Sequence, residues 1–409
     1  MKVIILGAGG RGRNYTRYCK QYGVDVVAIA DPDTKKLEKL ANDFEISKDR
    51  LYQDWEEVLA KEKFADAVIN ATPDKVHYAS TMTALEKDYH ILLEKPMSDN
   101  EQECIDMIEK AEEKEKILMV CHVLRYAPFF ERLKEIVQSQ RIGEIVNMNM
   151  TEHCANWHFV HSYVRGVFRN ETISSPFILA KSCHDLDLIG YITGKKCISV
   201  MSEGSLKHFR EENAPEGAPE FCLDGCPHEK TCPYFAPRLY LKQITQVGWP
   251  TQSISADTSY AARYEALKKG QYGRCAYRCD NDVNDHQSTI FTMEGDTIVS
   301  FNMTGLSSEN TRTLRIFGTK GNIRGHLEQG EIEIHDFLTG EKEEIKVDYT
   351  TIVSSHGGGD SRLVEAFVDA VRNGSNGADL KTSARLSLQS HLMAFAAEKS
   401  RKEGKRIYL

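Results

Sequence analysis

The stretch KVIILGAGGRG, residues 2–12, decides the fold of this chain. A short apolar run leads directly into a glycine-rich turn, and the residues that follow, as far as Tyr22, mix basic and apolar side chains as a surface helix does. Gly7, Gly9 and Gly12 are spaced as G-x-G-x-x-G between the expected strand and helix. In that context, backbone amides and the helix dipole bind a pyrophosphate. The stretch predicts a dinucleotide phosphate loop, with an ordinary tight turn as the alternative.

Asp31 closes the next apolar run, VDVVAIAD. A carboxylate at the end of the second strand accepts hydrogen bonds from the ribose hydroxyls of the adenosine. The same negative charge repels a 2′-phosphate. The sequence therefore predicts NAD as the cofactor, with NADP disfavoured.

Apolar runs and helical patterns then alternate along the first third of the chain. After Asp31 come TKKLEKLANDF, ADAVINATP, KVHYASTMTALEKD, HILLEKP, DNEQECIDMIEKAEEKE and ILMVCHVLRY. Such alternation indicates a parallel, doubly wound sheet. We assign residues 1–124 to an NAD-binding Rossmann domain.

Beyond residue 125 the pattern changes to strands joined by glycine-containing turns. Residues 287–347 predict hairpin-connected antiparallel strands, and two strong helical patterns follow near the end of the chain. Residues 125–409 are therefore expected to form an α+β domain with a large, mostly antiparallel sheet. A cysteine-containing insertion is expected around residues 205–285. The fold class is α/β, with two domains.

The bulk composition narrows the classes of function. The chain has 409 residues and a net charge of −8, which disfavours nucleic acid and anionic membranes as partners. Its first residues lack the basic region and cleavage site of a secretory signal, so we expect a cytoplasmic protein. In a reducing compartment, the eleven cysteines are expected to remain thiols or to bind metal.

Further motifs extend through most of the chain. They are GAGGRG, ATPDKVH (71–77), EKP (94–96), RYAPFFERLKEIVQSQRIGEI (125–145), CHDLDLIGYITG (183–194), GTKGNIRG (318–325) and AFAAEKSRKEGKRIYL (394–409). In their order and spacing, the chain resembles the Gfo/Idh/MocA family of NAD(P)-dependent sugar and polyol dehydrogenases. The resemblance implies a substrate held between the large sheet and the nicotinamide, and a homodimer or homotetramer built by stacking sheets. It also implies cofactor-binding roles for Gly7, Gly9, Gly10, Arg11, Gly12, Asp31, Thr72, Pro73, His77, Glu94 and Lys95.

Oxidation of an alcohol needs a base for the hydroxyl proton and a cation for the developing alkoxide. The resemblance assigns the cation to Lys95, and His184 matches the family's active-site histidine. Many family members have an aspartate four residues before that histidine, where this chain has Ala180. Lys181 is then a third catalytic candidate, and Asp187 is the better placed of two nearby acids. A solvated lysine and a buried structural histidine are the alternatives.

Residues 151–170 combine aromatic, basic and hydroxyl side chains, a mixture suited to a sugar. Helical spacing places Trp157, His161 and Arg165 on one face. The alternative is an interface or a solvated helix. The expected substrate-binding residues are Tyr126, Trp157, His158, His161, Arg165, Lys181 and His184.

The insertion contains FCLDGCPHEKTCPY (221–234) and RCAYRCD (274–280). Cys222, Cys226, Cys232 and Cys279 are candidate ligands of a structural zinc ion, with Cys275 as a further thiol. Packed thiols and a redox disulfide are the alternatives. In each case the expected task is to hold the insertion together.

Three functions remain open at this point. The leading hypothesis is an NAD-dependent oxidoreductase acting on a secondary hydroxyl of a sugar, glycoside or cyclitol. The second is redox-neutral glycoside cleavage, in which transient oxidation permits elimination of the aglycone. The third is a non-catalytic dinucleotide sensor, which Ala180 favours and which the retained Lys95 and His184 oppose.

Overall fold

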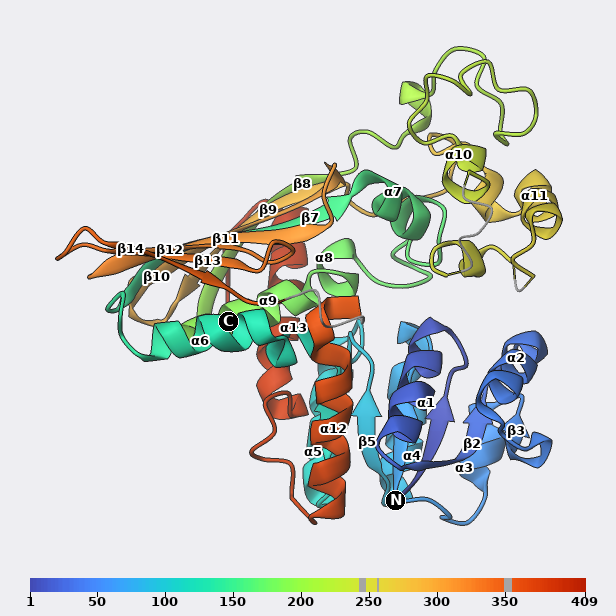
Figure 1. Ribbon diagram of the computed structural model, residues 1–409, viewed down its shortest axis with the longest axis horizontal. Helices are drawn as coiled ribbons and strands as arrows, with labels where there is room; N and C mark the ends of the chain where they lie inside the picture. The colour runs from blue at the N-terminus through green and yellow to red at the C-terminus, as the bar shows by residue number, and fades with distance from the viewer. Residues whose placement is uncertain (243–247, 256, 349–354) are drawn as a thin grey trace.

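Two sheets organise the computed structural model, which describes residues 1–242, 248–255, 257–348 and 355–409 (Figure 1). The first sheet has six strands and the second has nine. The first is parallel throughout, and the second is antiparallel except for one central pair. The predicted α/β class, a Rossmann domain followed by a domain with a mostly antiparallel sheet, is confirmed.

The Rossmann sheet has the strand order β3-β2-β1-β4-β5-β6. Its strands are β1 (Lys2–Leu6), β2 (Asp25–Ala30), β3 (Leu51–Tyr52), β4 (Ala67–Asn70), β5 (His90–Leu93) and β6 (Leu118–Val120). Its helices are α1 (Gly10–Gln21), α2 (Thr34–Phe44), α3 (Trp55–Ala60), α4 (His77–Glu86) and α5 (Glu101–Glu113). The order of the strands reverses between β1 and β4, where the loops at the carboxyl ends diverge and leave room for a ligand.

The second sheet has the order β14-β13-β12-β11-β7-β10-β9-β8-β15. Its strands are β7 (Ile145–Ala155), β8 (Cys197–Ser205), β9 (His286–Met293), β10 (Thr297–Ser307), β11 (Thr311–Gly318), β12 (Gly321–His326), β13 (Glu331–Asp336), β14 (Lys342–Lys346) and β15 (Ile407–Tyr408). Figure 1 shows α6 (Pro128–Gln138), α9 (Cys183–Thr193), α12 (Gly359–Arg372) and α13 (Ala384–Glu403) below this sheet, toward the Rossmann domain. These helices cover one face of the sheet and carry the domain junction.

A large part of the chain between β8 and β9 forms a separate lobe. It includes α10 (Ala236–Tyr240) and α11 (Tyr260–Lys269), which share a small core with Cys222 and Leu267. Residues 243–247 and 256 of this predicted insertion lie outside the described residues. In Figure 1 the lobe lies beyond the end of β7, next to the short helix α7 (Asn156–Phe159).

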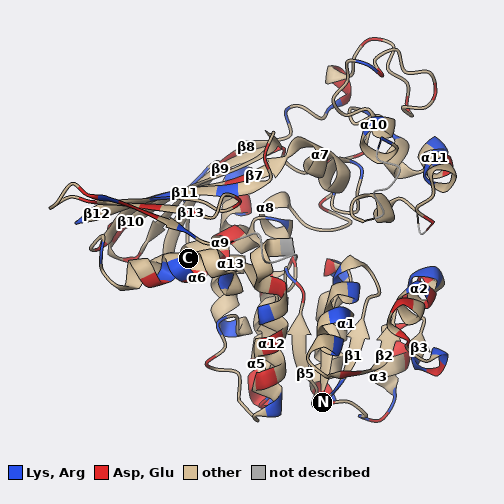
Figure 2. Ribbon diagram, viewed as in Figure 1, with Lys and Arg blue, Asp and Glu red and all other residues tan. Residues whose placement is uncertain are grey.

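Charged side chains of both signs are distributed over the same elements. Figure 2 shows blue and red segments together on α2, α5 and α12. Within the described part of the chain, no helix is long and apolar enough to span a bilayer.

Candidate functional site

The three motif glycines each have a separate structural task in the loop between β1 and α1. Gly7 has φ +95°, and a Cβ there would meet the carbonyl oxygen of Ala71. A Cβ at Gly12 would overlap the carbonyl oxygen of Gly7, whereas one at Gly9 meets nothing within 4 Å. Gly7 thus makes the turn, Gly12 lets helix and strand approach, and Gly9 leaves the loop open at the start of α1. These residues fit the pyrophosphate of NAD.

Asp31 follows β2 directly and faces this loop. Its Oδ2 accepts the backbone N–H of Ala8 at 2.7 Å, and its Oδ1 accepts that of Asp33 at 2.9 Å. Each carboxylate oxygen keeps a second lone pair for a ribose hydroxyl. The side chain is therefore fixed where the adenosine ribose of a dinucleotide lies in this fold.

His77 joins two loops at the carboxyl edge of the sheet. It is fully buried, with Nδ1 2.7 Å from the carbonyl oxygen of Pro96 and Nε2 2.9 Å from that of Thr72. The predicted cofactor residues Thr72 and Pro73 lie in the first of these loops, between β4 and α4. His77 thus positions both loops, and its direct contact with the cofactor stays a prediction.

Arg11 and Glu94 form a partly buried ion pair rather than two independent side chains. Arg11 also pairs with Asp360 at the start of α12, and Tyr15 donates a hydrogen bond to Glu94. Burial alone would raise the pKa of Glu94, but the positive charges of Arg11 and Lys95 outweigh it and lower that pKa. The pair links the phosphate loop to the end of β5 and to the second domain.

Lys95 reaches the turn that precedes His184 where the two domains adjoin. Lys95 lies just beyond the carboxyl end of β5, and its Nζ donates a hydrogen bond of 2.7 Å to the carbonyl oxygen of Ala180. Ala180 ends the short helix α8 (Phe177–Ala180), and His184 lies in the first turn of α9. The structure thus brings the predicted cation to the turn that leads into the predicted base.

His184 is surrounded by aromatic rings rather than by carboxylates. It is 5% exposed, and within the described residues its Nδ1 has no hydrogen-bond partner. The rings of His122 and His356 lie 5.7 and 5.6 Å away, centroid to centroid. Burial and then the charge of Lys95 hold the pKa of His184 well below its ordinary value. The ring is therefore neutral at neutral pH, and the same shift makes it a weaker base than an exposed histidine.

The two acids after His184 serve other partners. Asp187 accepts two hydrogen bonds of 2.7 Å from Arg125, and Asp185 accepts one of 2.6 Å from Arg312. The idea that Asp187 replaces the missing aspartate as a neighbour of His184 is therefore not supported by these contacts. A different carboxylate reaches His184 indirectly, because Asp360 Oδ2 lies 2.9 Å from Nδ1 of His356.

Lys181 belongs to a buried network of alternating charges. Its Nζ lies 3.2 Å from Glu152, whose other oxygen lies 2.8 Å from Arg312. Arg312 in turn binds Asp185. Burial raises the pKa of Asp185, although Arg312 opposes the shift. The network thus holds the Lys181 ammonium in place.

The predicted sugar-binding stretch divides into two parts. Trp157 and His158 lie on α7, and the backbone then forms a π-helical turn over Val160–Val164. His161 is buried, and its Nδ1 lies 2.9 Å from the hydroxyl of Tyr240 in the insertion. Because the π turn breaks the regular spacing, the prediction of one continuous helical face is not met.

Arg165 is fully buried at the base of the insertion. Its Nε and Nη2 donate hydrogen bonds of 2.7 Å to the carbonyl oxygens of Arg274 and Tyr234. These contacts fasten two insertion segments to the end of the π turn. The structure gives Arg165 a structural task, and its predicted contact with substrate finds no support in this geometry.

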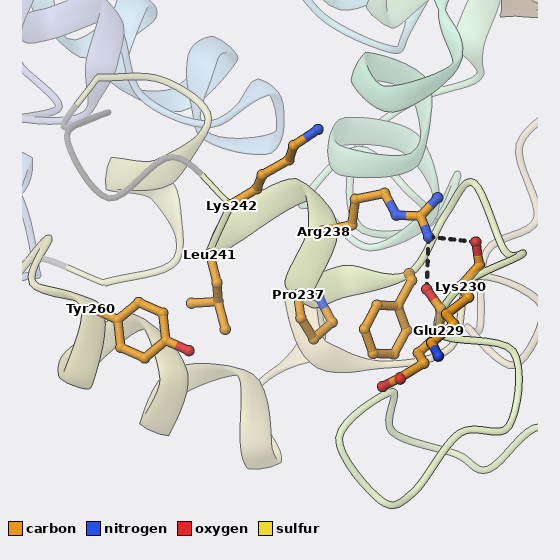
Figure 3. Close-up of a pocket in the computed structure, with 8 residues that line it drawn as sticks. Glu229, Lys230, Pro237, Arg238, Leu241, Lys242 and Tyr260 are labelled. Carbon is orange, nitrogen blue, oxygen red and sulfur yellow. Dashed lines mark hydrogen bonds between the residues drawn. The ribbon is translucent and has the colours of Figure 1, made fainter.

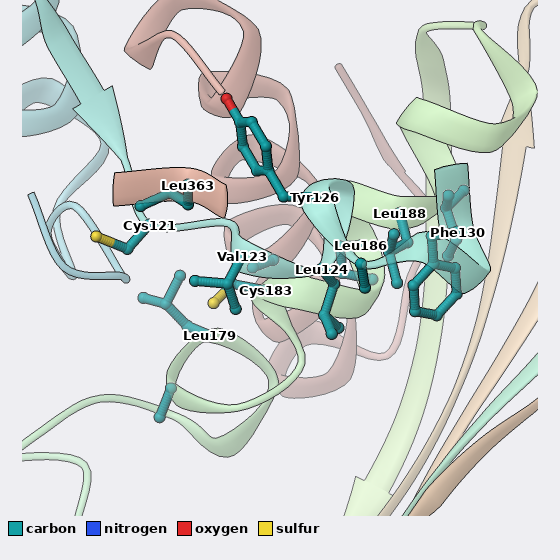
Figure 4. Close-up of a cluster of buried hydrophobic side chains, with 14 of the residues drawn as sticks. Cys121, Val123, Leu124, Tyr126, Phe130, Leu179, Cys183, Leu186, Leu188 and Leu363 are labelled. Carbon is teal, nitrogen blue, oxygen red and sulfur yellow. The ribbon is translucent and has the colours of Figure 1, made fainter. Parts of the chain in front are cut away.

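Tyr126 lies in a 3-10 turn (Val123–Tyr126) that follows β6, not at the end of that strand as the sequence indicates. Its ring is 5% exposed and lies beneath Lys381, 5.4 Å from the ammonium. Figure 4 shows it among buried side chains that include Leu363 and Leu186. This placement makes Tyr126 part of the domain-junction core rather than a wall of a substrate pocket.

The cysteines of the insertion form no metal site in the described part of the chain. No group of three or more candidate ligands is close enough to hold an ion there, so a structural zinc is not supported. Cys222 accepts the N–H of Ala236 at 3.5 Å, and Cys279 donates to the carbonyl of Cys275 at 3.3 Å. Burial raises the pKa of Cys279 to about 11. The geometry favours packed thiols, the second of the three alternatives.

A hollow of about 500 Å³ lies on the insertion, away from the predicted site residues (Figure 3). Arg238 closes one side of it by donating hydrogen bonds to the carbonyl oxygens of Glu229 and Lys230. Leu241 and Tyr260 line the other side. The hollow shares no residue with the site around Lys95.

Several further side chains shape this site. Glu152 lies on the inward-facing side of β7, the same side as the buried Met148, Met150 and Cys154. Arg312 likewise lies on the same face of β11 as buried apolar residues. A charged residue on the apolar face of a strand is the signal that identifies both. His122, His356 and Trp249 carry no comparable signal, because only the fold brings them to the site.

Comparison with protein families agrees with this geometry. Residues 1–122 match the model of an oxidoreductase family with an NAD-binding Rossmann fold, and residues 134–409 match the C-terminal alpha/beta domain of that family. The chain belongs to the Gfo/Idh/MocA oxidoreductase family. This oxidoreductase is therefore NAD-binding, as the phosphate loop predicts.

Individual relatives are distant. The putative oxidoreductase YteT of Bacillus subtilis is 24% identical over 370 residues, which cover 85% of this chain and 82% of that protein. The 2,7-anhydro-N-acetylneuraminate hydratase of Mediterraneibacter gnavus is 28% identical over 216 residues, about half of each chain. Levoglucosan dehydrogenase, solved with NADH and levoglucosan, has a TM-score of 0.72 at 16% identity and covers 100% of this oxidoreductase and 99% of that chain. The structural likeness shows the fold.

Proposed function

We propose that this oxidoreductase oxidises a secondary hydroxyl of a sugar, glycoside or cyclitol with NAD. The observation that carries the proposal is the hydrogen bond from Lys95 to the carbonyl of Ala180, which joins the end of β5 to the turn that bears His184. The names of relatives agree with it, since they include levoglucosan dehydrogenase and an inositol 2-dehydrogenase.

When bound, NAD supplies the acceptor for the hydride of the carbinol carbon. The residues of the chain manage the proton and the charge. Neutral His184 accepts the hydroxyl proton, and the Lys95 ammonium stabilises the negative charge that develops on the oxygen. Lys181, held by Glu152, orients the neighbouring hydroxyls. Asp31 favours NAD over NADP by repelling a 2′-phosphate.

The experiment is to incubate the purified protein with NAD and a panel of sugars, methyl glycosides and inositols, and to record NADH absorbance. We expect NADH with at least one substrate class. Silence across the panel, with NAD binding demonstrated by calorimetry, contradicts the proposal.

A second candidate is redox-neutral glycoside cleavage. The Lys181–Glu152 pair and the buried carboxyl of Asp185, whose pKa is raised by burial, offer proton-transfer groups beyond those that simple oxidation needs. A relative named as a hydratase supports chemistry without net oxidation. Release of aglycone without accumulation of NADH distinguishes this function from the first.

We also propose that the oxidoreductase assembles as a homodimer or homotetramer through the outer face of the nine-stranded sheet. Apolar side chains are exposed on this face, including Ile198 at 42%, Ile290 at 47% and Ile298 at 36%. Light scattering of the purified protein measures the assembly directly.

A further inference from the structure

We propose that Trp157 and Trp249 form a second carbohydrate subsite, which binds the aglycone of a glycoside while Lys95 acts on the first ring. The substrate class is then an aryl glycoside or a disaccharide rather than a free monosaccharide. This inference deepens the proposed function and rests on it for the position of the first ring.

The two indole rings come from distant parts of the chain and meet at the surface. Trp157 is the second residue of α7, which directly follows β7, and Trp249 is contributed by the insertion. Their centroids are 5.3 Å apart, and their planes are inclined by 55°. Trp157 is 37% exposed and Trp249 is 42% exposed. Two inclined aromatic faces, both accessible, offer the apolar walls that a second ring of a substrate needs.

Buried and partly buried side chains pack against this pair. The ring of His158 packs edge-on against Trp249 at 4.8 Å, and that of His161 does so at 5.3 Å. His161 is itself stacked on Tyr272 at 5.0 Å, and Nδ1 of His158 lies 2.8 Å from Asn310. Because the two indole side chains are already held in place, they lose little conformational entropy when a ligand binds. More of the free energy of their contacts with the ligand therefore appears as affinity.

Lys181 connects the subsite to the reactive residues. Lys181 directly follows Ala180, whose carbonyl binds Lys95, and its ammonium lies against Glu152. Five positions separate Glu152 from Trp157, which is at most about 17 Å of extended chain. Lys181 is also near enough that its charge, after burial, lowers the pKa of His158. A substrate whose first ring lies at Lys95 can therefore extend its second ring along the exposed faces of the two indoles, which lie too close together to enclose a ring between them.

The chemistry of the walls defines the occupant. Indole faces bind the C–H faces of sugars and the faces of phenyl rings, and they provide no charge to recognise a phosphate or a carboxylate. The Trp249 wall belongs to the insertion, so the insertion sets the size of the aglycone while the reacting groups stay on the two domains. The structure thus separates the choice of substrate from the chemical step.

Calorimetry on the NADH-saturated protein, in which no oxidation follows binding, tests this proposal. The probes are methyl and phenyl β-glycosides of glucose and galactose, together with cellobiose and lactose. We expect at least one phenyl glycoside or disaccharide to bind about tenfold more tightly than its methyl partner, the effect of one favourable aromatic contact. Trp249→Ala should remove this ratio, and Trp249→Phe should retain part of it. Tyr260→Ala, which removes another exposed aromatic ring of the insertion, should leave it unchanged.

Equal affinities for methyl and larger glycosides in the wild-type protein, no binding of any probe, or a ratio that survives Trp249→Ala would each overturn the subsite. Thermal unfolding of each variant checks that it has folded, and Trp249→Phe provides the readout if the alanine variant has not. Failure of the proposed function gives a different result. In that case the affinity ratio persists, but NAD-loaded wild-type protein oxidises none of the probes.

Discussion

Replacing Gly12 by alanine tests the phosphate loop, because this glycine permits α1 to approach β1. A methyl group at Gly12 would lie 1.8 Å from the carbonyl oxygen of Gly7, whereas ordinary contacts begin at 3.4 Å. The helix and the loop must therefore separate by about 1.6 Å, the difference between these distances. Gly7 cannot move away freely, since it is itself held against the carbonyl of Ala71.

The substitution should change both the free energy of unfolding and the affinity for NAD. Overpacking costs about 1–3 kcal/mol of unfolding free energy, and the better helix propensity of alanine returns up to about 1 kcal/mol. Moving the start of α1 also removes at least one charge-assisted hydrogen bond to the pyrophosphate. That loss is worth about 1.5–3 kcal/mol, or a 10- to 150-fold rise in the Kd for NAD.

Gly9→Ala is the matched variant, because a methyl group at Gly9 meets no protein atom within 4 Å. Its stability should stay within about 0.5 kcal/mol of wild type, while its affinity for NAD falls because the methyl group occupies the space left for the phosphates. Urea unfolding and calorimetric titration with NAD measure both quantities. Wild-type stability and wild-type NAD affinity in Gly12→Ala would refute the reasoning.

Three further predictions concern the charge network, the domain junction and the assembly. Lys181→Met leaves Glu152 with fewer cationic partners. It should lower the unfolding free energy, measured by urea unfolding, by about 1–3 kcal/mol. In steady-state kinetics it should raise KM more than it lowers kcat. Burial would raise the pKa of Asp360, but Arg11 and then His356 outweigh burial and hold that pKa well below its ordinary value. The ionised carboxylate therefore stabilises the folded protein above pH about 4, and this stabilisation is lost as the pH falls further. Asp360→Asn should therefore be less stable than wild type at pH 7, with a gap that narrows in urea unfolding at pH 3; a constant gap contradicts this. Ile290→Lys places a charge on the outer sheet face and should convert the oligomer to a monomer in light scattering, whereas an unchanged mass would exclude that face as the interface.

Local patterns were sufficient to predict the fold of the first domain. Five of the six Rossmann strands are short apolar runs next to helical patterns, so this secondary structure follows from neighbouring residues, whereas the two-residue strand β3 is not predicted. The strands β8 and β15 at one side of the second sheet are not predicted. β15, the edge strand, has only two residues and pairs with a segment about two hundred positions earlier. Such pairing is decided by tertiary contacts rather than by local sequence.

The site was predictable only where a residue's place in a motif fixes its place in space. Lys95 and His184 are of this kind, since one follows a Rossmann strand and the other opens a helix. Arg165 and Tyr126 were misjudged because an aromatic or basic residue in a polar stretch serves a buried junction as readily as a sugar. Trp249 was missed because only the folded insertion carries it to α7.

We propose that NAD oxidises a secondary hydroxyl at the carboxyl end of the Rossmann sheet, with His184 accepting the hydroxyl proton and Lys95 stabilising the charge on the oxygen. Rapid mixing of NAD-loaded protein with a glycoside substrate, followed by NADH absorbance within a single turnover, tests it most directly. We predict a burst of NADH in wild type, under either net oxidation or redox-neutral cleavage, and a burst slowed by at least about 100-fold in Lys95→Met with NAD affinity retained. A Lys95→Met burst as fast as that of wild type, or aglycone release with no NADH formed at any time, would contradict the account.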